Sequence, residues 1–182
     1  MTTLAESNQL FHRWPPLEVT QLHQKLRALE EMVQDLMRRD EGEVANELAR
    51  LLVVRSCGYL EQAIEICTRE HLTARAAPTA GSFASSWLGK GANPHPDFLI
   101  KYANRFDASW GEEIEQLLRA DDELLKREIS FLVNRRNKIS HGASEGVGVR
   151  KALNLLEYAD QMSDWFIEKL NPYSHQTTQQ TT

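Results

Sequence analysis

The chain has 182 residues, of which 41% are hydrophobic and 26% charged, and its formal net charge is -5 at pH 7. This length and composition suit one globular domain and exclude a chain that is disordered or membrane-embedded throughout. The mild acidity argues against a protein that coats nucleic acid nonspecifically, although it permits a local basic site. The longest apolar run, Leu51–Val54, is too short to cross a bilayer, and the N-terminus does not resemble a signal peptide. We therefore expect no membrane contact and a cytoplasmic location.

The first half of the chain is dominated by two long helical patterns. Residues 1–16 have no clear period and are expected to form an arm, whereas residues 17–39 carry apolar side chains at steps of three and four. The second pattern covers residues 43–75 and is apolar on nearly all sides in its middle, which is typical of the central helix of a bundle. Cys57 and Cys67 lie about 15 Å apart on such a helix, so we expect free thiols rather than a disulfide.

The middle of the chain predicts shorter elements. Residues 76–96 are rich in Gly, Pro and small polar side chains and are interpreted as a loop, with one helical turn near residues 83–88. Proline favours the first turn of a helix, so a short helix is expected to begin at Pro96. A further helix is expected near residues 108–120, with Ser109 as its N-cap in a capping box.

The C-terminal part completes an all-α pattern, with helices over residues 121–141 and 148–170. No stretch shows the alternation of a strand. We therefore predict a single-domain, up-and-down bundle of about five main helices over residues 17–171, with a short helical insert before the helix over residues 121–141. Residues 172–182 are polar and low in complexity, and we expect a disordered tail.

The most informative stretch ends the helix over residues 121–141. The apolar stripe of this helix consists of Leu125, Ile129 and Leu132. The next residue on the stripe is Arg136, and a buried guanidinium requires a partner. His141 follows five residues later, and Gly142 is expected to end the helix as a C-cap. Together, an Arg that holds a phosphoryl group and a His that moves a proton can perform phosphate chemistry.

The spacing of these two residues leaves two arrangements open. Five residues on an α-helix leave an angle of about 140°, so Arg136 and His141 do not share a face of an unbroken helix. Asn137 and His141 do share a face, at positions i and i+4. Arg136 and His141 converge if the helix ends or bends near Ser140, or if two copies of the motif meet across a dimer.

Two charged residues also interrupt the apolar middle of the second long helix. They are Arg55 and Glu61, and each needs a partner if it is buried. One interpretation is an internal salt bridge, or side chains that extend their charged ends to solvent. The other is that one of the two lines the same cleft as Arg136 and His141.

These features resemble a known family. Arg-Asn-x-x-x-His-Gly at residues 136–142, at the end of an apolar helix, resembles the Arg-x4-6-His signature of the HEPN superfamily, in particular its RiboL-PSP-like prokaryotic branch. Residues 50–61 are similar to an early helix of that branch that ends in a Glu, here Glu61. Residues 93–106 are similar to its short insert helix before the catalytic one. Together the resemblance covers roughly residues 42–170.

The resemblance implies a homodimeric, metal-independent ribonuclease that needs no cofactor. In this chemistry the ribose 2′-hydroxyl attacks the adjacent phosphorus and leaves a 2′,3′-cyclic phosphate and a 5′-hydroxyl. His141 would act as general base or general acid, and Arg136 would stabilise the charge on the phosphoryl oxygens. Asn137 would orient His141 or bond the phosphate, and Lys138 would attract the RNA backbone.

The resemblance assigns a supporting place in the site to Glu61, with Arg55 as the second candidate on the same helix. It also suggests a setting in prokaryotic defence or in a toxin–antitoxin pair, with a protein partner. Some HEPN toxins carry a Tyr two residues after the His, where a partner nucleotidyltransferase modifies them, but this chain has Ala143 there. Two other functions fit the sequence: a non-catalytic module that binds RNA, a nucleotide or a protein, and a purely structural helical dimer.

Overall fold

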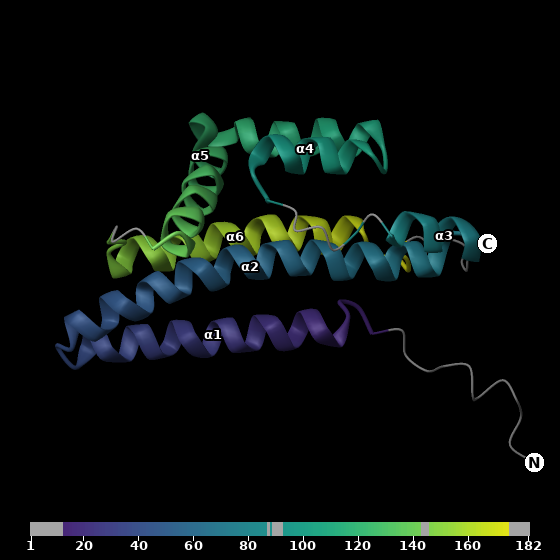
Figure 1. Cartoon of the computed structure of the whole chain (residues 1–182). Coiled ribbons are helices and arrows are strands. Elements are labelled where there is room, and N and C mark those ends of the chain that lie inside the picture. Colours follow the sequence, from purple (N-terminus) through teal and green to yellow (C-terminus); the bar gives the residue numbers. More distant parts are fainter. Residues whose placement is uncertain (1–12, 87, 89–92, 143–145, 175–182) are drawn as a thin grey trace, which may run out of the picture.

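The computed structural model describes residues 13–86, 88, 93–142 and 146–174, and all regular structure in these ranges is helical. The helices are α1 (Leu17–Arg38), α2 (Gly42–Arg75), α3 (Pro78–Ser85), α4 (Pro96–Asn104), α5 (Ala108–Ser140) and α6 (Val149–Lys169). They form a helical bundle with one core (Figure 1). The predicted all-α fold and single domain are confirmed. Among the described residues, no helix is both long and apolar enough to cross a bilayer.

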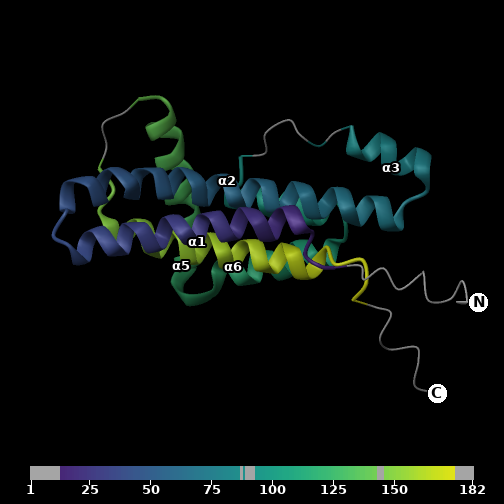
Figure 2. The ribbon, with the colours of Figure 1, turned by 90° about the horizontal axis from the view of Figure 1, so that it is seen from below.

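One layer of the bundle is a three-helix group of α1, α2 and α6, in which α1 lies below the other two in Figure 1 and between them in Figure 2. Helix α1 packs antiparallel to α2, as a short connection requires. Helix α6 instead runs parallel to α2, and two hydrogen bonds join the C-terminal ends of these helices. His71 hydrogen-bonds the Leu170 carbonyl at 2.9 Å, and Arg75 donates to the Pro172 carbonyl. The up-and-down order is therefore interrupted between α2 and α6, where α4 and α5 carry the chain back to the start of α2.

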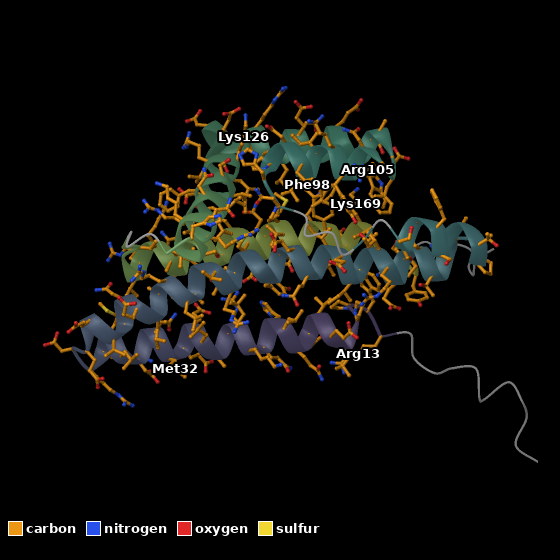
Figure 3. All side chains as sticks on the ribbon, viewed as in Figure 1. Arg13, Met32, Phe98, Arg105, Lys126 and Lys169 are labelled. Atoms are coloured by element: carbon orange, nitrogen blue, oxygen red, sulfur yellow. The ribbon has the colours of Figure 1, made fainter. Side chains whose placement is uncertain are left out.

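The second layer contains α4 and the first part of α5. Phe98 lies on the side of α4 that faces α6 (Figure 3), and its ring centroid is 5.5 Å from that of Tyr102. The Tyr102 hydroxyl donates to Thr68 Oγ1 of α2 at 2.8 Å, which satisfies a buried polar pair between the layers. Trp110 stacks on Phe106 with centroids 5.5 Å apart. Helix α4 begins at Pro96, as the sequence predicts.

The predicted cap of the next helix is wrong. Asp107, rather than Ser109, is the N-cap of α5, and its carboxylate accepts a hydrogen bond from the Ser109 backbone N–H at 2.8 Å. The helix begins two residues earlier than the predicted capping box requires. An ionised carboxylate accepts this bond more strongly than a hydroxyl does, which favours Asp107.

Helix α5 is bent where the sequence predicts the boundary between two helices. Residues Ala120–Glu123 have non-helical backbone angles, and Asp121, Asp122 and Glu123 have φ values of 48°, 53° and 60°. Left-handed backbone is unfavourable for residues other than glycine, although Asp tolerates it better than most. After this bend the second part of α5 descends steeply to the start of α6 (Figure 1).

The predicted loop over residues 76–96 is wrong at its start, where Pro78–Ser85 forms α3. The sequence shows no apolar period there, because α3 is short and contributes few large side chains to the core. It forms where α2 ends, with Pro78 at its first turn and Gly81 close to the Leu72 carbonyl oxygen. A Cβ on Gly81 would lie 3.5 Å from that oxygen.

The structure describes only part of the expected N-terminal arm and C-terminal tail. Trp14 Nε1 donates to the Ile167 carbonyl at 2.8 Å, so the residues just before α1 are attached to the end of α6. Most of the expected arm, residues 1–12, and most of the expected tail, residues 175–182, lie outside the described residues. Both expectations remain predictions.

Candidate active site

The predicted motif lies at the C-terminal end of α5, on the part of this helix that reaches the core. The residues of the apolar stripe, together with their neighbour on the same face, are buried: Leu125, Ile129, Leu132 and Val133. Their burial against α2 and α6 determines which way the following turn faces. Arg136 continues the stripe, and its side chain retains 24% exposure.

Arg136 is joined to α2 by two contacts. Its guanidinium donates to Glu61 Oε1, and its Nε donates to Cys57 Sγ at 3.4 Å. Cys57 and Glu61 are four residues apart and therefore share one face of α2. The partner that burial of Arg136 demands is thus Glu61. That Glu61 lines one cleft with both Arg136 and His141 stays a prediction. Cys57 was not predicted, although its i, i+4 relation to Glu61 was a usable signal.

The Arg136–Glu61 pair is only partly desolvated. Burial raises the pKa of the Glu61 carboxyl above its usual range, and the Arg136 charge offsets only part of this effect. Burial also raises the pKa of the Cys57 thiol, which keeps it protonated near neutral pH despite the adjacent guanidinium. Cys57 therefore acts as a neutral contact, and Glu61 is the charge partner of Arg136.

The helix ends just after this pair. Ser140 is its last residue, His141 is the C-cap, and Gly142 has a φ of 78°, a left-handed angle that glycine adopts without strain. The Gly142 N–H donates to the Ile139 carbonyl at 3.0 Å, which closes the last turn. The helix thus ends close to the predicted position, but its C-cap is His141, and Gly142 is the next residue. His141 is exposed, and its imidazole makes no hydrogen bond within the part of the chain that the structure describes.

Arg136 and His141 are near one another along the helix but face different sides. The His141 backbone N–H still donates to the Asn137 carbonyl at 3.1 Å, so His141 follows the helical path. The helix therefore ends too late to turn His141 toward Arg136, and an angle of about 140° separates the two positions. Of the two arrangements open from the sequence, a bend near Ser140 that turns His141 toward Arg136 is absent from this part of α5.

The other predicted site residues do not all lie near Arg136 and His141. Asn137 is half-buried and lies one turn before His141 on the same face, whereas Lys138 is exposed. Arg55 is exposed on α2 and lines a groove with residues of α1, a groove that includes neither Arg136 nor Glu61. The structure therefore groups Arg136 with Glu61, and Asn137 with His141, but it does not bring Arg55 to either pair.

A basic and aromatic cluster lies beside the motif. The Phe131 ring carries the Arg135 guanidinium at 4.9 Å from its centroid and the Lys151 ammonium at 4.8 Å. Lys151 also donates to both carboxylate oxygens of Glu128, at 2.7 and 2.5 Å. The place of Phe131 between two cations depends on how α5 meets α6.

No group of three or more His, Cys, Asp or Glu side chains within the described ranges is arranged to hold a metal ion. The functional groups at the end of α5 are therefore a guanidinium, an amide and an imidazole. Such groups bind anions and move protons.

These observations define an all-helical domain whose central helix supplies a Glu to an Arg near the end of a second core helix, with a solvent-exposed His five residues after that Arg. The model of the family described as RiboL-PSP-HEPN matches residues 20–171, and the chain belongs to this family. Neither a comparison with curated proteins nor one with solved structures found a match. The resemblance noted from the motif is thereby confirmed over most of the chain.

Proposed function

We propose that this chain is a metal-independent endoribonuclease that acts as a homodimer. The observation that carries the proposal is the Arg136–Glu61 pair, which holds a partly exposed guanidinium at the end of α5, close in sequence to the exposed imidazole of His141. Membership of the RiboL-PSP-HEPN family is consistent with a ribonuclease or a nucleotide-binding module. The exposed histidine favours the ribonuclease, because binding of phosphate alone does not require a proton carrier.

The reaction follows from the two side chains. His141 in its neutral form removes the proton from a ribose 2′-hydroxyl, and the resulting oxygen attacks the adjacent phosphorus. The bond between phosphorus and the 5′-oxygen breaks, and that oxygen takes up a proton to become a 5′-hydroxyl. The product on the other side is a 2′,3′-cyclic phosphate. Arg136 stabilises the negative charge that develops on the phosphoryl oxygens.

The dimer supplies the convergence that one copy lacks. Arg136 and His141 face different sides of one unbroken helix end, so an Arg from one subunit meets a His from the other near a two-fold axis. Asn137 orients His141 from the preceding turn, and Lys138 adds local attraction for the RNA backbone. The polar end of α5 then forms the interface around the axis.

We also propose, on the basis of the family, a role in prokaryotic defence or in a toxin–antitoxin pair with a protein partner. The alternative activity is a non-catalytic module that binds RNA, a nucleotide or a protein through Arg136 and His141. The two differ in one measurable property, because a binding module retains RNA affinity that falls with salt but leaves the RNA intact.

The first experiment is cleavage of a mixed RNA substrate in EDTA by the native protein and by His141→Ala. We expect cyclic phosphate ends from the native protein and no cleavage by the variant, with unchanged circular dichroism. His95→Ala is the matched control, since His95 is a second solvent-accessible histidine, at the start of α4. Intact RNA with both the native protein and the variant, at concentrations at which both bind it, would establish the binding module instead.

The shared site is tested by mixing two inactive variants. Arg136→Ala retains its histidine and His141→Ala retains its arginine, so a mixed dimer rebuilds one complete site. Mixing after brief unfolding and refolding is expected to restore up to about a quarter of native activity, because half the dimers are mixed and each holds one intact site. Native dimers with no recovery on mixing would show that each site lies within one subunit.

A further inference from the structure

A groove of about 600 Å³ lies between α1 and α2, and the active-site proposal makes no use of it. The described residues that line it come from these two helices alone. Half of its lining residues are aliphatic, among them Leu22 and Leu29 on α1 and Leu51 on α2, and Leu51 is 40% exposed. The groove also contains Arg55, the charged residue of the apolar middle of α2 that has no place beside Arg136.

The groove extends along the two helices. On α2 its lining extends from Leu51 to Gln62, and on α1 from Leu22 to Leu29. Eleven residue steps along α2 correspond to about 16 Å, or three helical turns. Two antiparallel helices that leave such a hollow offer the shape into which a third amphipathic helix packs its apolar side. A short segment of helix fits this length better than a compact small molecule does.

The charge on the groove has a single sign. Lys25 and Arg55 are among its lining residues, and no carboxylate is, within the described part of the chain. Neither cation forms an ion pair with another described residue, and no other described contact engages it. This is notable in a chain whose net charge is -5, in which Arg27, Arg38, Arg50, Arg69, Arg119 and Arg136 all contact carboxylates. Two unpaired cations beside an apolar hollow complement an acidic ligand.

Gly58 gives an independent indication that another helix packs against this groove. It lies in the middle of a 34-residue helix, where glycine is less favourable than alanine. A Cβ added there would meet only Gln62 Nε2, at 3.9 Å, so packing within the described chain does not require glycine. Gly58 lines the groove, where a missing side chain allows the backbone of another helix to approach closely.

We propose that the α1–α2 groove binds an acidic amphipathic helix of a partner protein. The apolar face of that helix covers Leu22, Leu29 and Leu51, and its carboxylates pair with Lys25 and Arg55. A second copy of this chain is a poorer occupant, because a two-fold axis through the groove brings like charges together. RNA is also a poorer occupant, since the aromatic residue among those lining the groove, Tyr59, is only 5% exposed and offers no platform on which bases could stack.

The probe is a pair of stapled helical peptides about four turns long. They share leucines at positions i, i+3, i+4 and i+7, and the flanking positions are all Glu in one and all Lys in the other. We expect the acidic peptide to bind the full-length protein more tightly than the basic one in fluorescence polarisation, with an affinity that falls as salt rises. Arg55→Glu is expected to weaken the acidic peptide at least about tenfold, because it places like charges together.

Two further variants sharpen the test. Lys25→Glu with Arg55→Glu is expected to reverse the preference, so that the basic peptide binds better. Gly58→Gln should block the groove sterically while preserving the helix, because glutamine is a good helix former. Lys101→Glu on α4 is the control, since it changes the same charge at an exposed position outside the groove. Circular dichroism checks that each variant is folded.

Three results would overturn the proposal. The first is equal binding of the two peptides, or equal effects of Arg55→Glu and Lys101→Glu. The second is a change in oligomeric state on Arg55→Glu or Gly58→Gln, which would assign the groove to a second copy of the chain. The third is displacement of the acidic peptide by a short single-stranded RNA, with loss of RNA binding in Arg55→Glu. None of these readouts depends on RNA cleavage, so the two proposals can fail separately.

Discussion

Two arginines join helices of this bundle through carboxylates, and their surroundings differ. Arg27 of α1 contacts Glu30 at 2.7 Å, Glu157 at 3.1 Å and also Asp160, and the last two lie on α6. Among the described residues, Arg136 of α5 contacts a single carboxylate, Glu61, and one neutral thiol. The side chains retain 34% and 24% exposure, so burial alone does not distinguish them.

The difference lies in how much negative charge surrounds each guanidinium. Three carboxylates more than neutralise Arg27, and His23 Nε2 lies 3.2 Å from Asp160 Oδ1, within ion-pair distance although without hydrogen-bond geometry. An added phosphate would meet net repulsion there. Arg136 has one carboxylate and a partly exposed guanidinium with donors to spare. The Arg27 cluster is therefore built to join α1 to α6, whereas Arg136 can accept a further anion.

The largest expected effect is on RNA cleavage, which should be lost on removal of Arg136 and retained on removal of Arg27. Arg136→Ala should lower kcat/KM for RNA cleavage about 10²–10³-fold, because it removes the group that stabilises the charge on the phosphoryl oxygens. Arg27→Ala should leave the kcat/KM of the folded protein close to native while reducing stability. Cleavage is measured well below the unfolding temperature of both variants. Equal losses of activity in the two variants would show that Arg27 and Arg136 do not differ in their role in cleavage.

The next effect is on stability, and it compares the carboxylates that contact the two arginines. Asp160 is 7% exposed and joins α1 to α6, so Asp160→Ala should cost about 2–3 kcal/mol in the free energy of unfolding. Arg27 retains two other carboxylates, which keeps the cost below that of a fully orphaned buried charge. Glu61→Ala should cost less, because its side chain is 24% exposed. Urea unfolding at pH 7 measures both, and a larger cost for Glu61→Ala would contradict this order.

The smallest effect is the pH dependence contributed by Glu61. Its folded-state pKa is raised by burial, so its stabilising contribution is complete below the unfolded-state pKa of about 4.3 and is lost as pH rises through the folded-state value. Glu61→Gln does not titrate. The stability of the native protein relative to this variant should therefore fall from pH 4 toward neutrality. Urea unfolding across this range tests the sign, and a relative gain in stability would show that Arg136 outweighs burial.

The fold and part of the site could be predicted because they depend on local pattern. Periodic apolar residues define α1, α2, α5 and α6, and glycine at position 142 marks the end of α5. The guanidinium of Arg136 on an apolar stripe already implied a buried partner. The helix α3 was missed because it forms by packing of small residues on α2, and the Asp107 cap was missed because two nearby polar residues were both suitable.

The amino-acid pattern was sufficient to establish an all-helical chain, the helix that ends at the Arg–His motif, and the need of Arg136 for a counter-charge, since these depend on periodicity and on the cost of burying charge. Only the tertiary structure placed Glu61 in contact with Arg136 and Arg55 away from it. This placement depends on which face of α2 meets α5: Cys57 and Glu61 lie on that face, whereas Arg55 faces the groove beside α1. The rotation of one helix against another is determined by the packing of the whole core, because many side chains contribute to it together.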